Sequence, residues 1–202
     1  MATVEGDLRF LDRPGGPVDP GWVVVGLVPR TKAIAVSGPG ASAAPLVIVT
    51  RTEVFHVDLE AVPLGRPVVL ANEGPLAHKL FSASLGSPRS VDLPPGTRSL
   101  PIELPAVGPI RFYCSLHADE TFVLFAAGVR HVQVVSSGGG FRLGSVAAGR
   151  YTLTVWGDRV SGPVREVVVD GYSRMLEPVW IDPDLLRPAD RPPAGTRSEP
   201  LR

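Results

Sequence analysis

The sequence is short of several residue types, and each shortage excludes a class of protein. It has one cysteine, so no disulfide can form within the chain. Its most apolar runs, 22–29 and 121–129, fall well short of the roughly 20 residues that a membrane-spanning helix needs. Basic and acidic side chains balance at 20 each and form no basic stripe, so nucleic acid is not expected as a partner.

Helix-forming sequence is also scarce. The 22 glycines and 22 prolines make up about a fifth of the 202 residues, against roughly an eighth in average proteins. Helix interiors tolerate neither residue well, and no stretch keeps a helical period for three turns. The hydrophobic fraction of 44% nevertheless supplies enough apolar side chain for a folded core. We therefore expect a folded chain without a helical bundle.

What the sequence does contain is a series of short runs rich in β-branched and aromatic residues. They lie at 22–28, 45–49, 66–70, 110–113, 121–125, 141–143, 151–156 and 164–169. Segments rich in glycine and proline separate them, which is typical of antiparallel β-sandwiches or barrels. After residue 181 the chain becomes a polar tail rich in proline and arginine, 182–202, without a periodic apolar face.

The lone cysteine lies in the most informative motif, Phe-Tyr-Cys-Ser-Leu-His-Ala-Asp-Glu at 112–120. Cys114 and His117 are three residues apart between two predicted strands, so both side chains can point at one centre. His78 lies upstream at the edge of another strand. Two imidazoles and a thiolate form the ligand set of a trigonal copper site. Asn72 is a candidate for tuning the site by hydrogen bonding.

The remaining candidates have simpler interpretations. His56 and His131 fall on predicted strands and are expected to be half-exposed sheet residues. Met175, the only methionine besides Met1, is expected to pack in a second group of strands. Trp156 is expected in the core of that second group.

The segment from His78 to Phe125 resembles a cupredoxin, the small blue-copper fold, with its Cys-x-x-His loop between two strands. It is most similar to the short-loop, amicyanin-like kind, in which a methionine follows three residues after the loop histidine. Here that position is Glu120. The longer loop of plastocyanin would put the axial ligand at Phe122, which cannot coordinate a metal. The resemblance implies one copper ion, cycling between Cu(I) and Cu(II), held by His78, Cys114 and His117.

Glu120 leaves two interpretations open. It is either a solvated loop carboxylate beside a three-coordinate copper, or an axial ligand. A carboxylate oxygen is harder than a thioether, so as an axial ligand it would favour Cu(II) and lower the reduction potential. Such a site would also accept Zn(II) or Co(II) more readily.

Two further parts of the chain resemble the two halves of a carboxypeptidase regulatory-like, transthyretin-type sandwich. The opening half is Val4–Phe10 with 16–18 and 22–25, and the closing half is Gly140–Trp156. Together with the copper motif they resemble bacterial cupredoxins of the methylamine utilisation type, over about residues 4–181. The expected fold is all-β, with a Greek-key cupredoxin sandwich inserted in or packed beside the second sandwich. The expected domains are 1–44 with 131–181 for the regulatory-like sandwich, 45–130 for the cupredoxin, and 182–202 for the tail.

The resemblance implies one-electron transfer to a redox partner, with a periplasmic or extracytoplasmic location. The partner would dock on an apolar rim formed by Pro75, Leu76, Leu116 and Ala118. No enzyme is expected, since motifs for nucleotide binding, zinc proteolysis and nucleophilic hydrolysis are missing. Two alternatives are a non-redox copper- or zinc-binding or delivery protein, and a structural sandwich module whose metal site is incidental.

Overall fold

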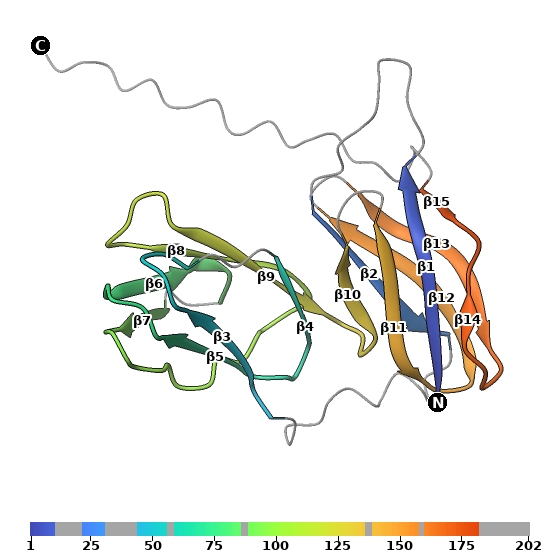
Figure 1. The fold of residues 1–202 in the computed structure, drawn as a ribbon, viewed down its shortest axis with the longest axis horizontal. Helices are drawn as coiled ribbons and strands as arrows, with labels where there is room; N and C mark the ends of the chain where they lie inside the picture. The colour runs from blue at the N-terminus through green and yellow to red at the C-terminus, as the bar shows by residue number, and fades with distance from the viewer. Residues whose placement is uncertain are drawn as a thin grey trace, which may run out of the picture.

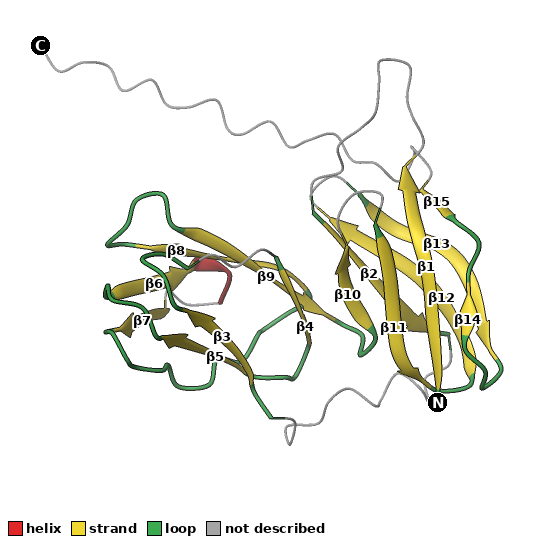
Figure 2. Cartoon of the chain, in the orientation of Figure 1, coloured by secondary structure: helices red, strands yellow, loops and turns green. Residues whose placement is uncertain are grey.

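The computed structural model of the chain describes residues 1–10, 22–30, 44–55, 59–85, 89–135, 139–157 and 160–181. The expectation of an all-β chain built from several sheets is confirmed. Within these ranges the single helical element is a 3₁₀ turn, η1, at Ala83–Leu85 (Figure 2). No helix in the described part of the chain is long and apolar enough to cross a membrane. The predicted tail, 182–202, lies outside the described residues.

Fifteen strands follow one another in the part of the chain that the structure describes. They are β1 (Ala2–Phe10), β2 (Val23–Pro29), β3 (Leu46–Thr50), β4 (Glu60–Pro63), β5 (Val68–Asn72), β6 (His78–Ser82), β7 (Arg89–Leu93), β8 (Gly108–Cys114), β9 (Thr121–Ala127), β10 (Val132–Val135), β11 (Gly140–Val146), β12 (Gly149–Gly157), β13 (Ser161–Val169), β14 (Arg174–Met175) and β15 (Val179–Ile181).

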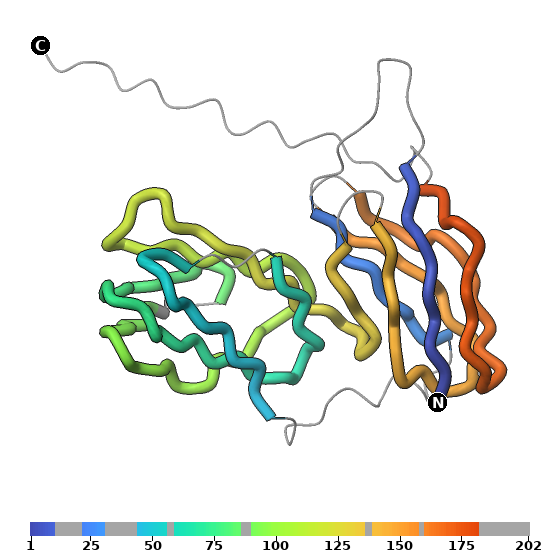
Figure 3. Tube along the Cα trace, viewed as in Figure 1, coloured from blue at the N-terminus to red at the C-terminus, as the bar shows by residue number. Residues whose placement is uncertain are grey.

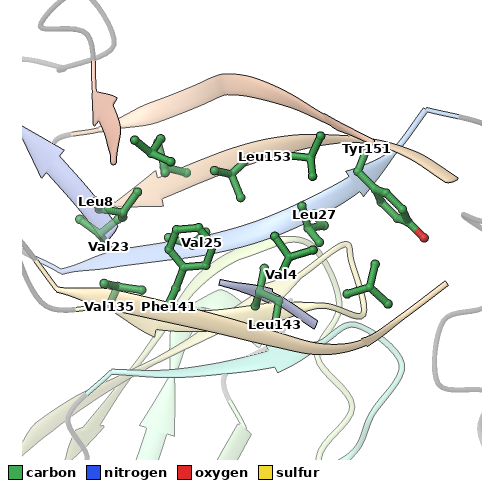
Figure 4. Packing of buried hydrophobic residues seen from close by; sticks show 14 of the residues in the cluster. Val4, Leu8, Val23, Val25, Leu27, Val135, Phe141, Leu143, Tyr151 and Leu153 are labelled. Carbon is green, nitrogen blue, oxygen red and sulfur yellow. The ribbon is translucent and has the colours of Figure 1, made fainter. Parts of the chain in front are cut away.

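The first sandwich, which we call the terminal sandwich, combines strands from both ends of the described chain. One sheet has the order β11-β1-β14, with β15 also paired to β1, and the other has the order β10-β2-β12-β13. Alternate residues of β1, such as Val4 and Leu8, are buried, as expected for a strand with one face in a core. They pack against Val25 and Leu27 of the facing sheet (Figure 4).

The second sandwich, which we call the central sandwich, is built from residues 46–127. Its sheets have the orders β3-β5 and β4-β9-β8-β6-β7. Alternation along β6 buries His78, Leu80 and Ser82, and alternation along β8 buries Phe112 and Cys114. The two-residue period of a strand therefore turns both a histidine and the cysteine towards the interior.

Figures 1 and 3 show how the chain divides between the two sandwiches. The blue and the orange-to-red segments lie together, while the segments coloured from cyan to yellow-green form the other half. A small apolar cluster, the junction cluster, lies between them. Its buried members are Val24, Phe125 and Ala127, and Trp22, Leu59, Ala61, Val129, Val132, Val134 and Trp156 pack against them.

The junction cluster corrects the prediction for Trp156. Its ring lies 5.9 Å from that of Phe125 on β9, so it packs between the sandwiches and not within the core of one. Gly26 on β2 makes this packing possible. A Cβ there would lie 2.9 Å from the Trp156 ring and 2.9 Å from a methyl group of Val129.

The sheets, for which the sequence predicted antiparallel pairing, also contain parallel strand pairs. The pairs β1–β14, β1–β15, β3–β5 and β4–β9 are parallel. The reason is that alternation of apolar and polar residues specifies which face of a strand is buried, and it leaves the direction of the neighbouring strand open.

Candidate metal centre

The candidate metal centre forms where β6 begins and β8 ends. Antiparallel pairing sets Leu80 opposite Cys114, which places His78 just beyond the cysteine on the neighbouring strand. The backbone N–H of Ser115 donates to the Lys79 carbonyl at 2.9 Å and extends this pairing by one more step. The first imidazole and the thiol are thus fixed by strand register.

A tight loop then returns the chain to the same place. The N–H of Glu120 donates to the His117 carbonyl at 3.1 Å, and the N–H of Cys114 donates to the Glu120 carbonyl at 3.1 Å. These bonds hold residues 115–119 in a compact turn between β8 and β9. His117 and Glu120, three residues apart, are thereby brought to the same end of the sandwich as the cysteine.

The structure brings together all four residues that the sequence singled out. Potential ligand atoms of His78, Cys114, His117 and Glu120 lie within 4.8 Å of one another. Glu120 Oε2 lies 3.0 Å from His78 Nδ1 and 2.8 Å from His117 Nδ1. The Sγ atom of Cys114 lies 3.5 Å from His117 Nδ1. Each of the two imidazoles therefore presents Nδ1 to the centre.

The donor set fits a single metal ion. Ligands at about 2.0–2.3 Å from one ion lie about 3.3–4 Å from each other. The donor atoms here lie 2.8, 3.0 and 3.5 Å apart, so they need only move slightly outwards to surround one ion. The Nε2 atom of His78 is buried without a hydrogen-bond partner among the described residues, whereas its Nδ1 atom faces Glu120 Oε2 at the centre. Two imidazole nitrogens, a thiolate sulfur and a carboxylate oxygen suit copper, and also zinc or cobalt.

Glu120 is buried, which excludes the interpretation of a solvated loop carboxylate. Its side chain has no exposed surface. Burial alone would raise the pKa of this carboxyl, but hydrogen bonds from the Phe55 backbone, Cys114, His117 and His78 together outweigh it and lower the pKa. The carboxylate is thus present as an anion that faces two imidazoles.

Aromatic rings pack against the buried side of the centre. The ring of Phe55 meets His78 edge-on at 5.0 Å and stacks on Phe122 at 5.6 Å. Phe122 stacks in turn on Phe112 at 4.8 Å. The contribution of Phe55 was not predicted, since a single phenylalanine distant in sequence from the Cys-x-x-His motif carries no signal of a metal site.

The opposite side of the centre reaches the surface through His117. Its side chain is 27% exposed, whereas that of His78 is fully buried. The residues predicted as an apolar rim, Pro75, Leu76, Leu116 and Ala118, are all exposed. They belong to the two loops that carry the histidines. One imidazole edge is thus accessible from solvent.

The other predicted residues lie away from this centre. Asn72 is buried and its amide donates to the carbonyls of Leu76 and Leu93, so it holds the loop before His78. His131 is half-buried near the junction cluster, and His56 lies outside the described residues. Met175 was expected to pack, but it is 72% exposed because it lies on the short edge strand β14.

Comparisons with known proteins gave likenesses of structure alone. No family model matches the chain, and no curated protein matches it in sequence. Among solved structures, an oxidised amicyanin variant is 12% identical, with a TM-score of 0.38 over 44% of this chain and 90% of that one. A purple cupredoxin from Nitrosopumilus maritimus is 17% identical, with a TM-score of 0.33 over 41% of this chain and 99% of that one. Another amicyanin variant, in its Cu(I) form, is 11% identical, with a TM-score of 0.37 over 51% of this chain and 98% of that one.

Proposed function

We propose that the protein binds one copper ion in a cupredoxin-type site and transfers single electrons. The observation that carries this proposal is the convergence of two imidazole nitrogens, a thiol and a carboxylate at one end of the central sandwich. Copper would supply the one-electron couple between Cu(I) and Cu(II). His78, Cys114 and His117 would hold it, and Glu120 would add a fourth donor.

The scaffold supports electron transfer because it restricts movement of the ligands. His78 and Cys114 lie on paired strands, and the loop from Ser115 to Glu120 is closed by backbone hydrogen bonds. Ligands held in this way keep nearly the same positions in both oxidation states, so little reorganisation accompanies the transfer. The partly exposed edge of His117 would provide the route to a redox partner.

The same proposal includes the division of the chain. Residues 45–130 would form the cupredoxin domain, and residues 1–44 with 131–181 a regulatory-like, transthyretin-type sandwich around it. The protein would act outside the cytoplasm, in the periplasm or beyond, as an electron carrier and not an enzyme.

Optical spectroscopy of the copper-loaded protein tests this function. Cu(II) should produce an intense visible thiolate-to-copper band in the wild type, and Cys114→Ser should abolish it. His131→Ala removes a histidine outside the centre and should leave the band intact, which makes it the matched control. A copper-loaded wild type without a visible band would overturn the proposal.

One observation favours a second candidate, a non-redox protein that holds or delivers a divalent ion. Glu120 completes a four-donor set with a hard anionic oxygen, a combination that also suits Zn(II). Under this alternative, protein from its native cells would contain zinc, and voltammetry of the copper form would show no reversible couple. A reversible couple together with copper in the isolated protein would exclude it.

A further inference from the structure

The two oxygens of Glu120 have different surroundings. Oε2 faces the imidazoles of His78 and His117, whereas Oε1 accepts a hydrogen bond from the backbone N–H of Phe55 at 2.6 Å. This amide belongs to the segment after β3, which lies in the other sheet of the central sandwich. A backbone group from across the sandwich therefore fixes the rotation of the carboxylate.

The position of that amide depends on Thr50. This residue ends β3, is 3% exposed, and its hydroxyl donates to the Val54 carbonyl at 2.8 Å. The bond closes residues 50–54 into a turn, and the next peptide N–H belongs to Phe55. Thr52 donates to the same carbonyl at 2.8 Å, but from an exposed position where water can replace it.

The turn is also pressed against the loop that leads to His78. The N–H of Glu73 donates to the Thr50 carbonyl at 2.8 Å. A Cβ on Gly74 would lie only 2.3 Å from the Thr52 carbonyl oxygen, so a larger residue there must displace the turn. The turn is thus enclosed by β3 on one side and by the loop from Glu73 on the other.

We infer that Thr50 is a positioning residue for the metal centre, which acts through the Val54 carbonyl and the Phe55 N–H on Glu120. It keeps Oε1 engaged, so that Oε2 alone faces the imidazoles of His78 and His117. This inference rests on the proposed metal-binding function. Loss of the Thr50 hydroxyl should let the carboxylate rotate or withdraw, with no change in the four ligating side chains.

The first test uses the metal-free protein. Amide hydrogen exchange measured by NMR should show a protected Phe55 N–H in the wild type and faster exchange in Thr50→Val. Thr50→Ser keeps the hydroxyl and should restore the protection. Thr154→Val removes a hydroxyl from β12 in the terminal sandwich, so Phe55 exchange should stay at the wild-type rate.

The second test uses the loaded protein. Zn(II) affinity of Thr50→Val should fall by about 10–100-fold, the usual range for residues that orient a ligand. The visible spectrum and reduction potential of its copper form should shift in the same direction as those of Glu120→Gln. Gly74→Ala, which displaces the same turn from the other side, should show the same shifts and provides a second variant if Thr50→Val folds poorly.

The outcomes separate this inference from the function on which it rests. If Thr50→Val keeps the visible band, spectrum, reduction potential and Phe55 exchange rate of the wild type, the role inferred for Thr50 is overturned while the copper site stands. A wild type that yields no thiolate-to-copper band would overturn the proposed function. In that case the inference would fall with it, even if Phe55 exchange still responded to Thr50→Val.

Discussion

The two sandwiches differ in what they bury. The core of the terminal sandwich consists of apolar side chains, with the tyrosine Tyr151 as its one hydroxyl-bearing member among the described residues. All the buried polar or charged residues that the structure describes lie in the central sandwich. They are Thr50, Asn72, His78, Ser82 and Glu120. Burying a polar group costs free energy of folding unless the group is hydrogen-bonded. The concentration of such residues in the central sandwich therefore indicates that this sandwich contains the functional site.

The largest expected effect compares one matched leucine from each sandwich. Leu153 and Leu80 are both fully buried, so Leu153→Ala and Leu80→Ala should each lower the free energy of unfolding by about 2–5 kcal/mol. Only Leu80 faces Cys114 across a strand pair. Denaturant unfolding should therefore show similar losses, while the copper spectrum should change in Leu80→Ala alone. A spectrum altered equally by Leu153→Ala would contradict the division of roles.

The next effect concerns how far metal binding in one sandwich stabilises the other. A free ion at 100 times its Kd should add about 2.7 kcal/mol to the stability of whatever unfolds with the site. In the wild type the junction cluster should couple both sandwiches into one transition that Zn(II) shifts as a whole.

Phe125→Ala breaks this coupling, because Phe125 contacts both Trp22 and Trp156. Tryptophan fluorescence during thermal unfolding should then separate into two transitions, and only the central sandwich should respond to Zn(II). Leu124→Ala is the control, since Leu124, the neighbour of Phe125 on β9, belongs to the core of the central sandwich instead. A single metal-dependent transition in Phe125→Ala would show that the sandwiches are coupled elsewhere.

The smallest expected effect is a pH dependence that arises outside the metal centre. Burial lowers the pKa of His131 from 6.5; the hydrogen bond with the Gly144 backbone opposes this shift, and Arg130 adds to it. The unfolded chain then binds more protons, so stability should fall as the pH drops below about 6.5. His131→Gln should reduce the slope of the unfolding midpoint between pH 7.5 and 5.5. An unchanged slope would show that this histidine does not contribute.

Much of this arrangement could be predicted from residues that are close in the sequence. β-branched runs predicted strands such as β5 and β9, and the spacing of Cys114 and His117 predicted a shared centre. His78 was added because it lies at the edge of another predicted strand, where the resemblance implies the first imidazole ligand, and the structure places it at the start of β6. These features depend on short-range pattern, which a single sequence contains.

The remaining features depend on contacts between distant segments. The burial of Glu120 follows from the approach of the Phe55 amide, which is 65 residues away in the chain. Trp156 packs between the two sandwiches because Phe125 of β9 lies against it. The parallel pairing of β3 with β5 likewise depends on which strand lies alongside. The local sequence pattern predicts whether a residue is buried or exposed. It does not predict which distant segment will contact that residue.

The junction cluster has a practical consequence for anyone who wishes to study the candidate metal centre in isolation. A fragment of residues 45–130 would present Leu59, just before β4, and Phe125 and Ala127 of β9 to water, at a junction that the whole chain covers. Contiguous apolar surface of this kind promotes aggregation. A soluble fragment would need polar replacements at these positions, and Phe125 would be the first to change, since it is the largest of the three.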